Sequence, residues 1–178
     1  MEKKDLLKDV IKHIDIKSYN STELVDAMRN MSFTSRDTAR AADILMMMCK
    51  EKECTNILTL AGSTSAAGCM QVYVDMVRNK MIDVVVATGA SIIDMDLFEA
   101  LGYKHYIGEK ENVIPDTTLR ELYIDRIYDT YIDEEELQAC DHSTYELANM
   151  LEARPYSSRE FIYEIGKWLH NGKAVKKD

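Results

Sequence analysis

Two short loops of small and hydroxyl-bearing residues are the parts of this sequence best suited to bind a phosphate group. The first, Ala61 to Gly68, reads AGSTSAAG, and the second, Thr88 to Ser91, reads TGAS. Glycine lets backbone approach a ligand closely, and serine and threonine hydroxyls donate hydrogen bonds. A helix that begins after such a loop presents free N–H groups to an anion. The two loops together predict a site for a dinucleotide pyrophosphate.

The same composition also suits two tight turns between a strand and a helix, with no ligand, and that alternative stays open. The familiar dinucleotide fingerprint GxGxxG is absent from the first loop. No acidic residue ends the second apolar run, where it would bind a ribose hydroxyl. An ordinary dehydrogenase is therefore disfavoured.

The segments around the loops predict a strand-helix-strand unit. An apolar run over 56–60 precedes the first loop, a helix follows it to about Asn79, and a β-branched run over 82–87 precedes the second loop. A further helix carries Asp94, Asp96 and Glu99 in its first turns and stops near Gly102. Such a crossover requires parallel strands, and ligands of open α/β sheets bind beyond the carboxyl ends of these strands. Both loops lie at those ends.

Two helices are expected before this unit. Asn20 and Glu23 have the spacing of a capping box at the start of a helix that reaches Met31. A second helix starts near Ser35. Its apolar residues recur at spacings of three and four, which predicts one buried face, made of Ala39, Ala42, Leu45, Met46 and Cys49.

The part that follows Gly108 is expected to be helical and polar. Ser143 with Glu146, and Ser157 with Glu160, have capping-box spacing. An apolar stripe then runs from Phe161 to Leu169, and Asn171-Gly172 marks a helix stop. The charged tail, 173–178, is expected to be loose.

The chain is long enough for a single domain over 1–178. It divides into a helical segment (1–54), a βαβ core that carries the loops (55–108) and a second helical segment (109–178). Only two strands are convincing, with a third if 104–107 pairs, whereas doubly wound sheets usually have more. An open edge at Val84 to Val86 would be an aggregation hazard unless another segment pairs with it. The fold class is therefore α/β, with a sheet that is incomplete in this chain.

Charge and composition exclude several functions. A formal charge of −9 disfavours nucleic acid and anionic membranes as partners. An acidic chain suits cationic ligands, although acidity also serves solubility alone. The amino terminus interleaves charges with apolar residues, so neither a signal peptide nor a membrane span is expected. Reduced thiols and a cytoplasmic location are the default, and Cys140 with His142 do not make a metal site.

Four ordered motifs cover nearly the whole chain: TLAGSTSAAG, MIDVVVATGASIIDMDLFEALGYKHYIG, LYIDRIYDTYIDEEEL and RPYSSREFIYEIGKWL. Together they resemble the deoxyhypusine synthase family, and more closely its bacterial and archaeal deoxyhypusine-synthase-like branch. The resemblance implies a modified Rossmann domain, a homotetramer and NAD bound at dimer interfaces. It also implies a reaction in which NAD oxidises spermidine and an aminobutyl group passes through an imine on a lysine to an acceptor amine.

The resemblance assigns cofactor contacts by position. Gly62, Ser63 and Thr64 match the family's first NAD loop, and the run Thr88, Gly89, Ala90 and Ser91 matches its second. Asp94 matches a glutamate near the cofactor and the polyamine. Met95 replaces the next family glutamate, which puts substrate recognition of the true synthases in doubt. Asp96 matches an acidic position for which a capping or dipole role is expected.

The family continues for well over a hundred residues beyond the point where the resemblance ends, at Lys176 to Asp178. That continuation carries the histidine base, the polyamine carboxylates and the imine-forming lysine, so no residue here is assigned a catalytic role. Neither Lys104 nor Lys110 lies in a sequence context that predicts the desolvation needed to lower a lysine pKa.

Three functions stay open. The first is an NAD-binding half of an aminobutyl transferase, inactive alone, whose sheet is completed by a missing carboxy-terminal half or by another chain in a tetramer-like assembly. The second is a non-catalytic module that regulates or scaffolds a full-length relative. The third is a truncated product with no role of its own. The sequence identifies neither the acceptor amine nor whether hypusine is made.

Overall fold

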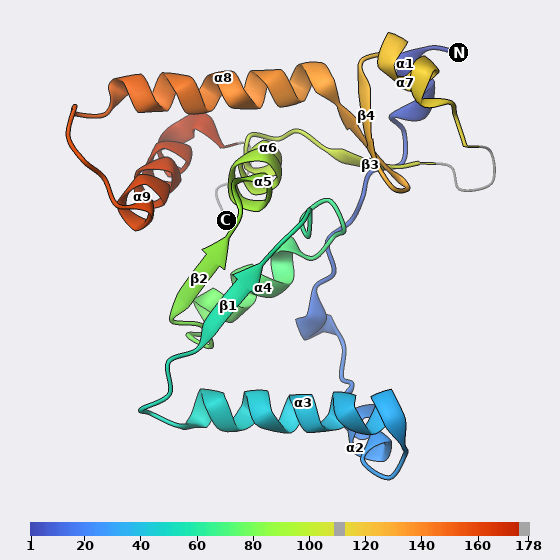
Figure 1. The fold of residues 1–178 in the computed structure, drawn as a ribbon, viewed down its shortest axis with the longest axis vertical. Coiled ribbons are helices and arrows are strands. Elements are labelled where there is room, and N and C mark those ends of the chain that lie inside the picture. Colours follow the sequence, from blue (N-terminus) through green and yellow to red (C-terminus); the bar gives the residue numbers. More distant parts are fainter. Residues whose placement is uncertain (109–112, 175–178) are drawn as a thin grey trace. The chain divides into compact units, whose positions relative to one another are not determined.

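The computed structural model describes residues 1–108 and 113–174, and these form an α/β fold. Contacts within the chain gather into two compact units, which we describe separately (Figure 1). The first unit holds 1–12, 61–68 and the chain from Thr88 onward, and the second holds 13–60 and 69–87. Whether they act as the single domain expected from the sequence stays a prediction.

The second unit contains the parallel strands. Strands β1 (Ile57–Leu60) and β2 (Val84–Ala87) pair in parallel, with Ile57 opposite Val84 and Leu60 opposite Ala87. Helix α4 (Met70–Arg78) forms the crossover between them and ends at Asn79. The strand-helix-strand unit is therefore confirmed. It forms because short β-branched runs are separated by a segment long enough for a crossover helix.

The unit also contains the 3₁₀ turn η1 (Ile16–Ser18) and the helices α2 (Thr22–Met28) and α3 (Phe33–Lys50). Asn20 does not cap α2 as expected. Its Oδ1 accepts a hydrogen bond from the Thr22 N–H, and the N-cap residue is Ser21. The expected buried face of α3 is also wrong for most of its residues, because only Ala39 of the set is buried and Met46 is 52% exposed.

In the first unit, one helical stretch begins inside the predicted second loop, because Thr88 is its N-cap residue and Gly89 to Ser91 are already helical. It runs from Gly89 to Ala100 as α5 (Gly89–Ser91), the π-helical segment η2 (Ile92–Leu97) and α6 (Phe98–Ala100). Two longer helices, α8 (Glu134–Met150) and α9 (Ser158–Trp168), follow later in the chain, and α9 leads into the π-helical turn η3 (Leu169–Lys173). A core cluster joins these elements, with Met95, Phe98, Cys140, Leu147 and Ile165 buried in it.

An antiparallel sheet completes this unit. Its strands are β3 (His105–Ile107), β4 (Ile124–Ile127) and β5 (Thr130–Asp133), in the order β3-β5-β4. The possible third strand forms, but it pairs in this antiparallel sheet and not with β1 and β2. The expectation that 109–178 is helical misses the β4-β5 hairpin. The two-residue turn, Tyr128 and Asp129, has no glycine, and Tyr128 itself takes the left-handed conformation with φ of 53°.

The amino-terminal segment belongs to this sheet as well. Val10 pairs antiparallel with Tyr106, the Ile11 N–H donates to the His105 carbonyl, and the Ile107 N–H donates to that of Asp9. The short helices α1 (Lys3–Leu6) and α7 (Asp116–Glu121) contribute Leu6 and Leu119 to a second cluster.

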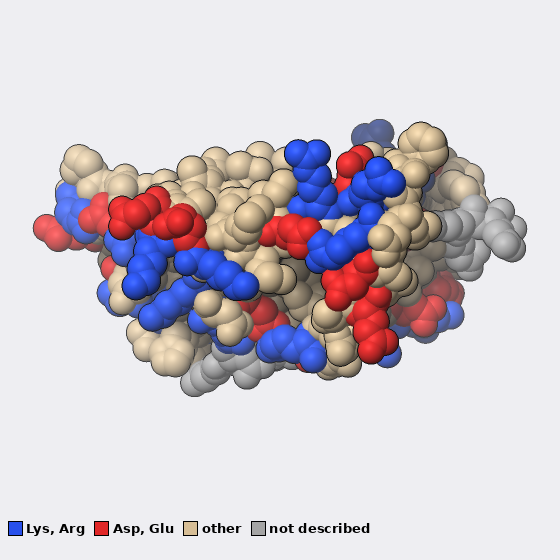
Figure 2. All heavy atoms as spheres, turned by 90° about the horizontal axis from the view of Figure 1, so that it is seen from below, with Lys and Arg blue, Asp and Glu red and all other residues tan. Residues whose placement is uncertain are grey.

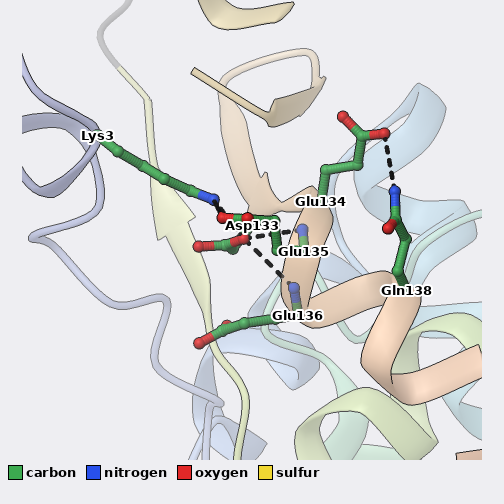
Figure 3. A network of polar contacts seen from close by, with 6 residues as sticks. All are labelled: Lys3, Asp133, Glu134, Glu135, Glu136 and Gln138. Carbon is green, nitrogen blue, oxygen red and sulfur yellow. Dashed lines mark hydrogen bonds and ion pairs between the residues drawn. The ribbon is translucent and has the colours of Figure 1, made fainter. Parts of the chain in front are cut away.

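Helix α8 begins at a carboxylate cap, not at a serine (Figure 3). Asp133 Oδ1 accepts hydrogen bonds from the N–H groups of Glu135 and Glu136 and lies 2.6 Å from Lys3 Nζ. The expected capping box of Ser143 and Glu146 is wrong, since both lie inside α8 and the Ser143 hydroxyl donates to the Ala139 carbonyl. The box of Ser157 and Glu160 is confirmed at the start of α9.

Basic and acidic side chains are interspersed on the face that Figure 2 shows. Among the described residues, Arg29 forms ion pairs with Asp26 and Asp43. A face of mixed sign lacks the continuous positive charge that attracts a phosphate backbone. Within the described ranges, 1–108 and 113–174, no helix is both long and apolar enough to cross a bilayer.

Candidate functional site

The two small-residue loops lie together in the first unit, and a part-buried hydrogen bond joins them. The Ser91 hydroxyl donates to the carbonyl oxygen of Gly62 at 2.6 Å. The Thr88 hydroxyl oxygen is 3.4 Å from the Ser91 oxygen. Ser91 is fully buried, so its hydroxyl holds the loops together in this structure. Its expected part in binding a cofactor stays a prediction.

A second side-chain bond links the same two regions. Ser65, which is also fully buried, donates from its hydroxyl to the carboxylate of Asp96 in η2. Asp96 therefore anchors the first loop, and it lies seven residues after the helix begins at Gly89 rather than in its first turn. A contact between residues this far apart has no local sequence signal, which is why only a capping or dipole role was expected.

Gly68 closes the first loop against the amino-terminal segment. Its φ is +81°, and a Cβ atom there would lie 2.8 Å from the Lys12 carbonyl oxygen. Within the loop, the Ala67 N–H donates to the Ser63 carbonyl and the Gly68 N–H to that of Ser65. The loop is thus held at both ends, by Gly62 and by Gly68.

The opposite side of the loops is open. A Cβ atom built on Gly62 or Gly89 would meet no described atom within 4 Å. Thr88, Gly89 and Ala90 are exposed at the start of the helix, where the first N–H groups have no partner within a helix. Backbone that is free of neighbours beside free N–H groups is the arrangement that phosphate binding uses.

Thr64 supplies an unsatisfied polar atom in the first loop. Its Oγ1 is buried and has no hydrogen-bond partner among the residues that the structure describes. A buried hydroxyl without a partner costs free energy, on the order of 1–3 kcal/mol. A bound ligand that accepts from Thr64 would remove that cost, so the loop fits a group with acceptor oxygens. Ser63, beside it, is half-buried.

Asp94 lies in η2, three residues after Ser91, and its electrostatic neighbours are on α8. Burial, and then the charge of Asp141, raises the pKa of the Asp94 carboxyl above its usual value. Cys140 is fully buried beside them, with its thiol near the Ile93 carbonyl oxygen, and burial raises its pKa to about 12. π-Helical segments inside α-helices often occur at functional sites.

Met95, at the position where the resemblance implies an acidic residue, is part of the core. It is 5% exposed, and its sulfur is 3.1 Å from Nε2 of the buried His105. The other ring nitrogen of His105 is 2.6 Å from Glu99 Oε1. Met95 therefore offers no polar group to a ligand. Glu99 contacts His105 directly, so its role is not limited to a favourable interaction with the helix dipole.

Of the two lysines considered as imine formers, one lies among the described residues. Lys104 is half-buried just before β3, and Lys110 lies outside the described residues. Lys176 to Asp178, where the resemblance ends, also lie outside them.

Comparison with known proteins gives a consistent family. The family model for deoxyhypusine synthase matches residues 23–177. A deoxyhypusine synthase-like protein from Caulobacter vibrioides is 63% identical over 98% of this chain and 47% of its own length. Proteins of the same name are 57% identical in Coxiella burnetii, over 99% of this chain and 49% of their length, and 53% identical in Elusimicrobium minutum, over 97% and 47%. The chain thus spans about half the length of the curated relatives it matches.

Proposed function

This chain belongs to the deoxyhypusine synthase family, and on that basis we propose that it is the NAD-binding half of a deoxyhypusine-synthase-like aminobutyl transferase. The proposed substrates are spermidine or related polyamines. A complementary carboxy-terminal half, or a full-length relative, supplies the catalytic residues in a tetramer-like assembly. The chain matches only 47–49% of the length of the relatives, which supports a split between a cofactor-binding half and a catalytic half.

The proposal rests mainly on an unsatisfied hydroxyl and open space at the two loops. Thr64 Oγ1 is buried without a partner among the described residues, and the space around Gly62 and Gly89 is open. In the proposed site, the Thr64 and Ser63 hydroxyls donate to the cofactor, as do the N–H groups at the start of the helix. Ser91 and Asp96 hold the loops in place behind them.

NAD supplies the hydride acceptor for the oxidation of the polyamine when it is bound. The contribution of this chain is to bind and orient. Asp94, as a carboxylate, attracts the cationic amines of the substrate, and its raised pKa means that a lower pH weakens this attraction sooner than for an ordinary aspartate. The proposed chemistry has no catalytic residue in this chain, which alone is inactive.

The proposed fold is also shared between this chain and the complementary half. We infer that β1 and β2 belong to a larger Rossmann-like sheet whose further strands come from the complementary half. The exposed valines of β2 support this, because parallel strands are normally covered on both faces. Two strands with helices on one chain would then be the amino-terminal part of that sheet.

A second candidate is a non-catalytic module that binds and regulates a full-length relative. The burial of Met95, at a position where the true synthases carry a glutamate, favours it. In that case the chain binds a full-length relative but adds no transferase activity to the carboxy-terminal half.

Activity measured with separate and combined halves tests the proposal. The chain, the carboxy-terminal half of the Caulobacter vibrioides relative, and a mixture of both are each incubated with NAD, spermidine and putrescine. We expect diaminopropane from the mixture and none above a no-protein control from the chain alone. Release by the chain alone would contradict the proposal, and an inactive but stable complex would favour the non-catalytic module.

A further inference from the structure

Helix α3 presents an apolar face that the described residues leave uncovered. Ile44 is 43% exposed and Met47 is 61% exposed, although a helix of a folded domain normally turns such residues toward a core. At the start of the helix, Phe33 is 90% exposed and has a φ of 55°, an uncommon conformation for a bulky residue. Apolar surface concentrated on one element marks a site of association.

A groove lies on this face near the end of α3. It has a volume of about 550 Å³, and the residues that line it come from the end of the helix and the turn after it: Ile44, Met47, Met48, Lys50, Glu51 and Cys54. Pockets for small molecules enclose most of the ligand surface. A groove built from one helix and one turn cannot do so, but it can receive side chains of another protein segment. Methionines suit such contacts because they adapt to the shape of a partner.

The groove is fixed to the start of the parallel sheet. Cys54 lies at its end, and the Cys54 thiol donates to the side-chain oxygen of Asn56. The Asn56 N–H donates to Asp83 Oδ2 at 2.8 Å, and its side-chain amide donates to the Met81 carbonyl at 3.0 Å. The turn after α3 is therefore tied to the segments that precede both β1 and β2.

The strands beyond this tie are uncovered as well. Ile57 at the start of β1 is 56% exposed, and Val86 in β2 is 55% exposed. Parallel strands with exposed β-branched residues call for covering elements and for further strands at their edges. The apolar surface of the groove and that of the sheet thus lie in one unit and follow each other along the chain.

We propose that the α3 groove is a docking surface for the complementary carboxy-terminal half, and that the partner seats apolar side chains between Met47 and Cys54. This rests on the proposed function, in which that half is the partner. The curated relatives carry about as much chain again as they share with this one. A segment of that size can cover the groove and extend the sheet together. A second copy of this chain, docked groove to groove, would leave the sheet edges open.

Matched variants on α3 test the docking surface. Met47→Glu places a charge in the groove, whereas Met46→Glu makes the same change at a neighbouring exposed residue that does not line it. Binding to the carboxy-terminal half of the Caulobacter vibrioides relative is measured by calorimetry. We expect Met47→Glu to weaken binding at least tenfold and Met46→Glu to change it less than about twofold. Circular dichroism confirms that both variants fold.

Thiol alkylation gives a measurement that needs no substitution. Cys54 lines the groove, and Cys49, on the same helix, is exposed but does not line it. Mass spectrometry follows the reaction of each with iodoacetamide before and after the halves are mixed. We expect the Cys54 rate to fall at least fivefold in the complex and the Cys49 rate to stay within twofold.

The outcomes separate the docking proposal from the proposed function. A complex that forms equally well with Met47→Glu and leaves Cys54 reactive overturns the docking surface alone. A complex that needs Met47 but releases no diaminopropane supports the docking surface and contradicts the proposed transferase. Self-association of the chain that Met47→Glu abolishes, with Cys54 already protected, would assign the groove to a second copy and overturn this proposal. If the two halves form no complex, both proposals fail.

Discussion

The Ser91 hydroxyl donates a 2.6 Å hydrogen bond to the carbonyl oxygen of Gly62, and this bond joins two loops that are 29 residues apart in the sequence. Each loop follows one of the parallel strands, so the bond also fixes the ends of the two βα connections relative to each other. Together with the hydrogen bond from Ser65 to Asp96, this bond holds the two loops in a fixed arrangement and so preorganises the proposed cofactor site.

Replacing Ser91 by alanine should destabilise the chain. The change removes the Ser91 hydroxyl that donates to the Gly62 carbonyl in a part-buried hydrogen bond, at an expected cost of about 0.5–1.5 kcal/mol in the free energy of unfolding. Urea denaturation measures it. The control is Ser63→Ala, at a half-buried position in the first loop, which should cost less than about 0.5 kcal/mol. Equal effects of the two substitutions would contradict the structural role of Ser91.

The sequence predicted the two loops and placed them after strands, but it did not predict the roles of Ser65, Ser91 and Asp96. Small-residue loops after apolar runs are local patterns, and these are readable from one sequence. Which hydroxyl faces a ligand and which faces the other loop depends on a long-range pairing. Ser63, Thr64, Ser65 and Ser91 have similar side chains, so composition alone cannot separate them.

Two glycines should respond differently to alanine. Gly68→Ala puts a Cβ atom 2.8 Å from the Lys12 carbonyl oxygen at a φ of +81°, and should cost roughly 1–3 kcal/mol. Gly89→Ala meets no described atom within 4 Å and lies at a helix start, so it should leave stability within about 0.5 kcal/mol or raise it slightly. Thermal unfolding of both variants tests this. A Gly89→Ala variant as unstable as Gly68→Ala would show that Gly89 is needed for the fold rather than for a ligand.

Asp94 should make stability depend on pH. Its pKa is raised in the folded chain, by burial first and by Asp141 second. A carboxyl group whose pKa is higher in the folded chain than in the unfolded chain stabilises the fold when the pH is below the pKa of the unfolded chain. This contribution to stability is lost as the pH rises through the pKa of the folded chain. Asp94→Asn should therefore be more stable than the original chain at pH 7, with a smaller difference at pH 4.

Urea unfolding between pH 4 and pH 7 measures that difference. Asp141→Asn is the control, because it removes one of the two causes and should move the pH window downward. Asp94→Asn being the less stable chain at pH 7 would mean that the carboxylate is stabilised by a partner.

Cys140 should be almost inert. It is fully buried, and its pKa of about 12 lowers the thiolate fraction at pH 8 roughly a thousandfold relative to an ordinary cysteine. In native chain treated with iodoacetamide, Cys49 should react first and Cys140 only after unfolding. Modification of Cys140 at a rate close to that of Cys49 would show that α8 does not pack against η2 as described.

The strands show how much of the fold the sequence could supply. Strands β1 and β2 are short β-branched runs bounded by turn residues, and both were predicted within two residues. The β4-β5 hairpin was missed because its charged residues suggested a polar helix and its turn has Tyr128 where glycine is expected. The apolar period of α3 predicted a helix correctly, but it could not tell a buried face from one left for a partner.

Calorimetry of NAD binding tests the central claim, that these loops form a cofactor site completed by a second half. NAD is titrated into the chain alone, into its complex with the carboxy-terminal half of the Caulobacter vibrioides relative, and into the same complex carrying Gly89→Val. A Cβ atom at position 89 meets no described atom within 4 Å, so the larger side chain is expected to extend into the proposed ligand space, and circular dichroism checks that the variant folds. We expect binding by the complex, weak or no binding by the chain alone, and none by the Gly89→Val complex. Equal binding by the chain alone, or undiminished binding with Gly89→Val, would contradict the account.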